Sequence, residues 1–141
     1  MADNEQIAII NARVWTGNPH RPWADAVLIR GDRIELVGSS AEVRKQSAVL
    51  CRRIDARGML VVPRLKDART GLADDALIQA VQSSLQGIVA PELNVLKAGA
   101  TADLAIFDRD FTRAMPGEAG IAQVILVMVA GRVLFDRAGL V

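Results

Sequence analysis

The chain has 141 residues, enough for one domain with a sizeable core, and 51% of them are hydrophobic. The net charge is +1, from 17 basic and 16 acidic residues that are interspersed, so the composition argues against a nucleic-acid-binding surface. The longest apolar run, Val124 to Ala130, is too short to span a bilayer, the N-terminus is polar and unlike a signal peptide, and the single cysteine permits no internal disulfide, which together favour a cytoplasmic protein.

The first sixty residues predict short strands joined by tight turns. The predicted strands are Ile7–Ile10, Val14–Thr16, Ala24–Arg30, Arg33–Val37, Leu50–Asp55 and Met59–Val62. The turn residues 11–13 suggest that the first two strands form a hairpin-like pair, and residues 17–22 predict a loop. Gly31-Asp32 predicts a two-residue hairpin turn, and Pro63 ends the last strand because proline cannot donate to a ladder.

Two helices are predicted. Ser39 and Glu42 form the pattern of a capping box that opens a short helix to about Gln46, with Val43 as its inward anchor. Residues 74–86 carry apolar side chains at i, i+4 and i+8, which is typical of an amphipathic helix.

The C-terminal part returns to strands. They are predicted at Ala102–Asp108, Ile121–Val129 and Val133–Asp136. The near-continuous apolar run of the second implies burial on both faces. The fold class that follows is mostly β, a β-sandwich or folded-over pseudo-barrel with two short helices. We expect a single domain over residues 1–141, built from a β segment 5–63, a junction with a helix 64–90, and a β segment 92–137.

Five stretches carry a resemblance to a known family: residues 11–17, 24–38, 54–70, 96–108 and 124–136. In order and spacing they resemble the two terminal segments of the amidohydrolase (metal-dependent hydrolase) superfamily. In that family the segments form a small β domain, the composite domain, around an inserted (β/α)8 barrel that carries the metal and the chemistry. Such a barrel needs roughly 250 residues. Because the region between Thr70 and Pro91 holds one helix, the resemblance implies a composite domain with the barrel missing.

The junction departs from the family pattern. After the Val-Val-Pro strand the family has Gly-Phe-Ile-Asp-x-His-x-His, whose histidines bind the metal. Here only Asp67 matches a fixed position, and Arg69 and Gly71 stand where the histidines should be. A guanidinium cannot ligate a divalent metal, glycine has no side chain, and the chain has one histidine in total. We therefore predict no catalytic, cofactor-binding or metal-binding residue and no cofactor.

The residues that could carry chemistry have simpler explanations. His20 lies in a predicted surface loop, and Cys51 in an alternating strand is explained as a small buried or half-buried thiol. Asp74-Asp75 at a helix start suits capping and the helix dipole, and Asp103 and Asp108 flank a strand, where they serve turns and hydrogen bonds.

Two basic clusters could attract an anion. They are Arg52-Arg53 and the group of Arg64, Lys66 and Arg69. Solvated charges, or partners of nearby acids, explain them better. Neither cluster is accompanied by a glycine-rich phosphate loop.

The hypothesis that the sequence favours is a metal-free, barrel-less β module that is not an enzyme. Its high aliphatic content suggests an apolar face covered by a second copy, so we expect a homodimer. The alternative is a component of a metal-dependent hydrolase acting on non-peptide carbon–nitrogen bonds, with the barrel supplied by another chain. A third hypothesis is a decayed or recombined gene whose product still folds.

Overall fold

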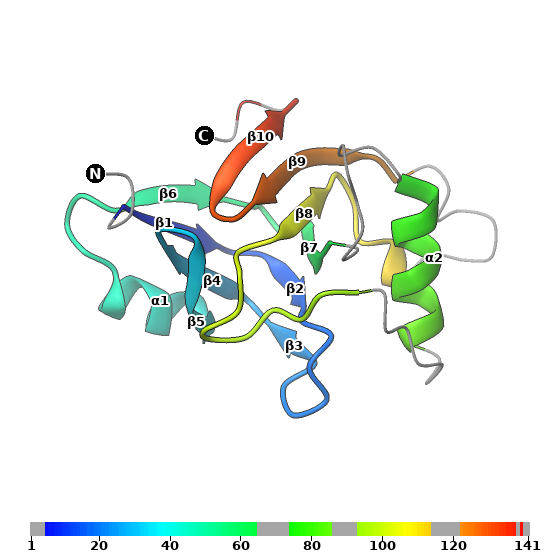
Figure 1. Cartoon of the computed structure of the whole chain (residues 1–141), viewed down its shortest axis with the longest axis horizontal. Coiled ribbons are helices and arrows are strands. Elements are labelled where there is room, and N and C mark those ends of the chain that lie inside the picture. Colours follow the sequence, from blue (N-terminus) through cyan, green and yellow to red (C-terminus); the bar gives the residue numbers. More distant parts are fainter. Residues whose placement is uncertain (1–4, 65–73, 86–92, 114–121, 138, 140–141) are drawn as a thin grey trace.

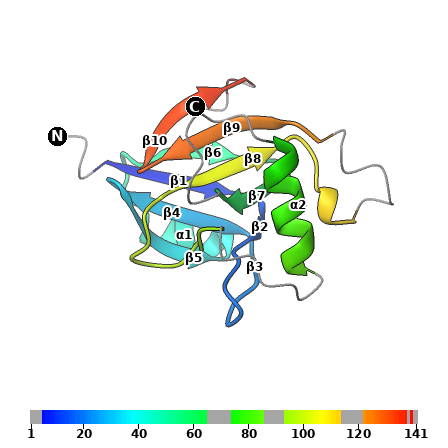
Figure 2. The ribbon, with the colours of Figure 1, turned by 45° about the vertical axis from the view of Figure 1, so that its right-hand side comes forward.

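The computed structural model describes residues 5–64, 74–85, 93–113, 122–137 and 139, and it shows two packed β-sheets with a helix on each outer face (Figures 1 and 2). The mostly β fold class is confirmed, and the two sheets do not close into a barrel. One sheet has four strands in the order β5-β4-β1-β6, and the other has six in the order β10-β9-β8-β7-β2-β3.

The four-stranded sheet and its helix come from the N-terminal part: β1 (Gln6–Ile10), β4 (Ala26–Arg30), β5 (Arg33–Gly38), α1 (Ser40–Gln46) and β6 (Arg52–Asp55). The six-stranded sheet and its helix draw on both ends of the chain: β2 (Arg13–Trp15), β3 (Trp23–Ala24), β7 (Leu60–Pro63), α2 (Asp74–Leu85), β8 (Leu104–Phe107), β9 (Val124–Val129) and β10 (Arg132–Asp136). A 3-10 turn, η2 (Phe111–Arg113), follows β8.

The predicted pairing of the first two strands is wrong. β1 pairs antiparallel with β4 and parallel with β6, whereas β2 pairs with β3 and β7 in the other sheet. The chain passes from one sheet to the other at Asn11, whose φ of 55° lies in the left-handed region that asparagine tolerates. The connection after β6 makes the same crossing, and Gly58 N–H donates to the Asn11 carbonyl at 2.7 Å. This hydrogen bond therefore joins the two segments in which the chain crosses between the sheets.

The local turn and capping predictions are confirmed. β4 and β5 form an antiparallel hairpin around Gly31-Asp32. In α1, the Ser39 hydroxyl accepts from Glu42 N–H at 3.1 Å, and the Glu42 carboxylate accepts from Ser39 N–H at 3.2 Å. Val43 is fully buried against the four-stranded sheet.

Three apolar layers hold the molecule together. The largest lies between the sheets and includes Ile9, Ile29, Ile54, Ile106 and Leu126. The others lie beneath the helices, where α2 covers one face of the six-stranded sheet and α1 covers the outer face of the four-stranded sheet. β9 contributes to both faces of its sheet, so its first five residues are all buried, as its apolar run predicted.

Two hairpin turns meet at one end of the sandwich. Gly131 in the β9–β10 turn packs so closely on the Gly31 carbonyl of the β4–β5 turn that a Cβ at Gly131 would lie 1.9 Å from that oxygen. Ala102 joins the two turns, because its N–H donates to the Asp32 carbonyl at 2.9 Å and its carbonyl accepts from Gly131 N–H at 3.1 Å. This contact locks the two sheets together.

Candidate functional site

The junction between the two β segments is the candidate functional site. β7, the last strand before the junction, lies between β2 from the N-terminal segment and β8 from the C-terminal segment, with Pro63 opposite Leu104. Arg64 N–H donates to the Asp103 carbonyl at 3.4 Å, and Asn94 N–H donates to the Arg64 carbonyl at 2.9 Å. The chain therefore leaves the sheet and returns to it at the same point.

Arg64 is buried at this junction, with 6% of its surface exposed. The interpretation of Arg64 as a solvated charge is wrong, because so little of the residue is exposed, and its backbone is bonded to Asp103 and Asn94. The other junction residues singled out in the sequence, Lys66, Asp67, Arg69 and Gly71, lie outside the described residues. So do the side chains of Asp74 and Asp75.

His20 and Cys51 lie in separate parts of the molecule. His20 is exposed in the loop between β2 and β3, and Cys51 is half-buried just before β6; in Figure 1 that loop lies at the bottom and β6 begins at the left. The thiol contacts the Arg52 carbonyl at 3.3 Å, and burial raises the pKa of Cys51 above its ordinary value. A protonated thiol is a poor nucleophile, so this burial disfavours a nucleophilic role for Cys51.

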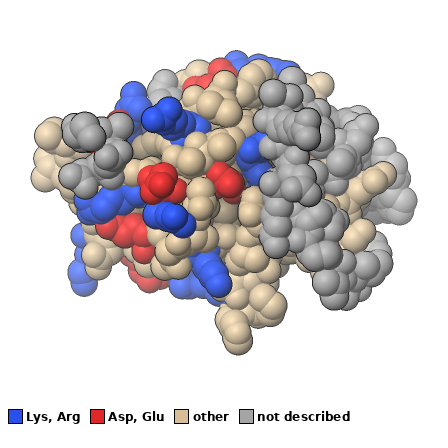
Figure 3. All heavy atoms as spheres, viewed as in Figure 1, with Lys and Arg blue, Asp and Glu red and all other residues tan. Residues whose placement is uncertain are grey.

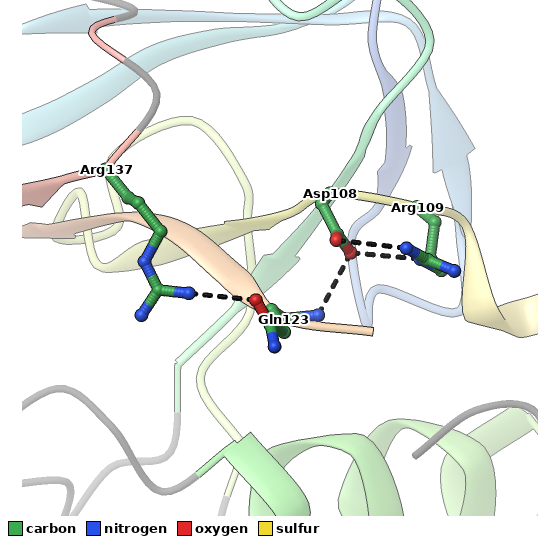
Figure 4. A network of polar contacts seen from close by, with 4 residues as sticks. All are labelled: Asp108, Arg109, Gln123 and Arg137. Carbon is green, nitrogen blue, oxygen red and sulfur yellow. Dashed lines mark hydrogen bonds and ion pairs between the residues drawn. The ribbon is translucent and has the colours of Figure 1, made fainter. Parts of the chain in front are cut away.

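Asp103 and Asp108 both bind backbone, as predicted. Asp103 accepts from Ala130 N–H at 2.7 Å. Asp108 accepts from Gln123 N–H at 3.0 Å and pairs with Arg109 at 3.3 Å, while Arg137 donates to the Gln123 side chain at 2.9 Å (Figure 4). Partial burial acts to raise the pKa of Asp108, but these hydrogen bonds outweigh it and hold the pKa below the ordinary range. The network fixes the ends of β8, β9 and β10.

A second polar cluster was not predicted from the sequence. The Arg13 guanidinium lies 3.8 Å above the Trp23 ring and pairs with Asp110 at 2.6 Å. A cavity of about 260 Å³ borders Arg13, Trp23 and Arg21. Arg21 is held by the Val37 carbonyl at 3.1 Å. Arg13 and Asp110 are distant in sequence and no motif links them, so only the fold reveals the pair.

The described part of the chain offers no group of three or more His, Cys, Asp or Glu side chains that could hold a metal ion. Together with Arg69 and Gly71 at the positions of the family's histidines, this donor set does not fit the metal that the resemblance implies. None of the helices among the described residues is long and apolar enough to cross a membrane.

The fold thus defines the class of domain: an open β-sandwich in which both β segments meet at one junction. No family model matches the sequence. The chain is 38% identical over 73 residues to an N-substituted formamide deformylase from Arthrobacter pascens, a match that covers 52% of this chain and 14% of that protein.

Solved structures similar to this chain include an uncharacterized metal-dependent hydrolase from Pyrococcus horikoshii OT3, with 20% identity and a TM-score of 0.41 over 55% of this chain and 16% of that one. A D-aminoacylase described as defining a novel subset of amidohydrolases is 30% identical, with a TM-score of 0.35 over 59% of this chain and 17% of that one. The resemblance predicted from the sequence is confirmed: a protein named as a metal-dependent hydrolase and one described as an amidohydrolase are similar to about half of the chain.

These relatives correct one prediction. The chain was expected not to be an enzyme, on the ground that its metal ligands and barrel are missing. The sequence relative is named a deformylase, and the similarity therefore points to an enzyme family. The two proteins named above as a deformylase and a D-aminoacylase are matched by this chain over 14% and 17% of their length.

Proposed function

We propose that this chain forms the β domain of a cytoplasmic metal-dependent hydrolase acting on carbon–nitrogen bonds other than peptide bonds, with the metal-bearing barrel supplied by another chain. The observation that carries the proposal is the 38% identity over 73 residues to the formamide deformylase. The metal and its hydrolytic chemistry would reside in the barrel, because the described residues of this chain include no group of His, Cys, Asp and Glu side chains that could hold a metal ion.

The geometry of the junction supports this role. A segment or domain is accommodated best where the chain leaves and re-enters a fold at one place, because the surrounding structure is then not disturbed. Arg64 and Asn94 satisfy this condition through their 2.9 Å backbone hydrogen bond. The six-stranded sheet that carries the junction combines strands from both β segments, so a barrel docked there would contact one continuous sheet.

The side of the molecule that would face the barrel is set by α2 and η2. Both lie beside the junction end of the six-stranded sheet, at the right of Figures 1 and 2. α2 buries Leu77, Ile78 and Val81 on that sheet, and the 3-10 turn buries Phe111 against Phe107, with ring centroids 4.9 Å apart. A partner would therefore meet a packed, pre-ordered surface.

The test is native mass spectrometry of the tagged protein recovered from lysate of its source organism, with divalent metal and carbon–nitrogen hydrolase activity measured on the same sample. We expect a complex with a larger, metal-bearing chain that hydrolyses an N-substituted formamide. Recovery of this chain alone or only with copies of itself, from lysate that retains the hydrolase activity in another fraction, would overturn the proposal.

A further inference from the structure

β6 is an open edge of the four-stranded sheet. It pairs in parallel with β1, and within the described residues no other strand lies beside it. An edge strand presents unpaired N–H and C=O groups that can template another strand. Just before β6 the chain exposes two large aliphatic side chains, Val49 at 97% and Leu50 at 94%. The edge and the apolar pair lie next to each other in sequence and form one unpartnered border.

The register shows which backbone groups are available. Ile10 lies opposite Asp55, and its carbonyl accepts from Ala56 N–H at 2.9 Å. In a parallel ladder alternate residues bond to the neighbouring strand, so Ile54 turns its backbone groups toward β1. Arg53 and Asp55 turn theirs outward. Their side chains share the outer face of the sheet, because the side chain of Ile54 between them lies in the core between the sheets.

We propose that β6 pairs antiparallel with β6 of a second copy of this chain, about a two-fold axis at Ile54. In that register the outward backbone groups of Arg53 meet those of Asp55 in the second copy, and the reverse pair is identical by symmetry. Each guanidinium then faces a carboxylate on the same face of the joined sheet, an arrangement that stabilises strand pairs. The edge is complementary to itself in both hydrogen bonding and charge.

The surroundings of Asp55 leave room for this pair. Asp55 Oδ1 accepts from Arg57 N–H at 3.0 Å and from the Asn11 amide at 3.3 Å. These bonds orient the carboxylate and lower its pKa, so it is charged at neutral pH. Both bonds use Oδ1, and Oδ2 can accept from Arg53 of the second copy.

The exposed aliphatic pair gains cover in the same arrangement. Val49 and Leu50 lie in the turn just before β6, which the Cys51 N–H closes by donating to the Ala48 carbonyl at 3.0 Å, so both side chains border the end of the strand pair. Burying apolar side chains at the ends of the strand pair would add to the four edge hydrogen bonds that two residues per copy provide.

The wider surface agrees with self-pairing. Lysine and arginine atoms lie interspersed with aspartate and glutamate atoms over the left half of Figure 3, the side on which β6 and α1 lie in Figure 1. A surface of mixed charge does not repel its own copy. The pairing joins the two four-stranded sheets into one continuous sheet, and it does not depend on the hydrolase role proposed above.

The experiment is sedimentation equilibrium on the full chain at micromolar concentration, with charge-swapped variants. We expect a wild-type dimer, and a dissociation constant raised about tenfold or more in Arg53→Asp and in Asp55→Arg, since each places like charges opposite each other at two symmetric positions. Mixing the two single variants should restore the dimer as a heterodimer, because every pair is then again opposite in charge. Lys97→Asp makes the same charge change in an exposed turn and should leave the dimer intact.

A backbone variant separates strand pairing from charge. Arg53→Pro removes an outward N–H without breaking the ladder with β1, so it should give a folded monomer. A wild-type monomer, a dimer that persists in Arg53→Pro, or mixed variants that remain monomeric would each overturn the proposal. The proposal would also be overturned if the wild type binds a different, larger chain and the Arg53 variants lose that chain, because β6 would then pair with another partner.

Discussion

Replacing Gly131 with alanine should destabilise the protein by about 2–5 kcal/mol. The φ of Gly131 is 77°, where an L-residue costs about 1–2 kcal/mol. The added Cβ would also lie 1.9 Å from the Gly31 carbonyl oxygen and 2.9 Å from its carbon. Both atoms are backbone, so the turn itself must move, and overpacking of this kind costs about 1–3 kcal/mol more.

Gly58→Ala is the matched control. Its φ of 82° imposes the same backbone strain, but a Cβ there meets nothing within 4 Å. We expect about 1–2 kcal/mol for this variant. Urea unfolding followed by circular dichroism at one fixed protein concentration measures both, with an unchanged m-value showing that only stability differs. Equal destabilisation of the two variants would refute the idea that the contact between the hairpins locks the sheets.

Three smaller perturbations test the other interactions described above. Val43→Ala should cost about 1–3 kcal/mol, because the Val43 side chain of α1 is fully buried against the four-stranded sheet. Ser39→Ala removes the capping box and should cost about 1 kcal/mol, measured in the same way. Asp108 has a pKa below its ordinary range, so its stabilising contribution is present above the ordinary carboxyl range and is lost as the pH falls through the lowered pKa. Asp108→Asn should therefore lower stability at pH 7, and its effect should shrink as the pH falls through the lowered pKa; a difference that does not shrink on acidification would contradict this assignment.

Local chemistry in the sequence predicted the elements that depend on neighbouring residues. Gly31-Asp32 and the Ser39–Glu42 capping box each specify a conformation within four residues, and both are found as predicted. Their signals need no knowledge of the rest of the chain. Prediction from sequence is strongest where an element is closed by its own hydrogen bonds.

Strand partners could not be predicted in the same way. β1 and β2 are short apolar strands separated by two residues, which is also the pattern of a hairpin. Their true partners come from later in the chain, and apolar runs buried on both faces do not specify which strand lies beside them. The burial of Arg64 and the pairing of Arg13 with Asp110 were hidden for the same reason, since each depends on segments far apart in the sequence.

The two proposals use different surfaces, which allows one experiment to separate them. The junction lies beside α2, whereas the β6 edge lies away from that helix in both views of the ribbon (Figures 1 and 2). If both proposals hold, the complex recovered from source lysate should contain two copies of this chain and two barrel-bearing chains. Arg53→Pro should then halve the mass of the complex and retain the metal and the hydrolase activity, because the junction is unchanged. A variant that loses the barrel-bearing chain together with the second copy would show that β6 also serves the barrel, and the assignment of the two surfaces would be wrong.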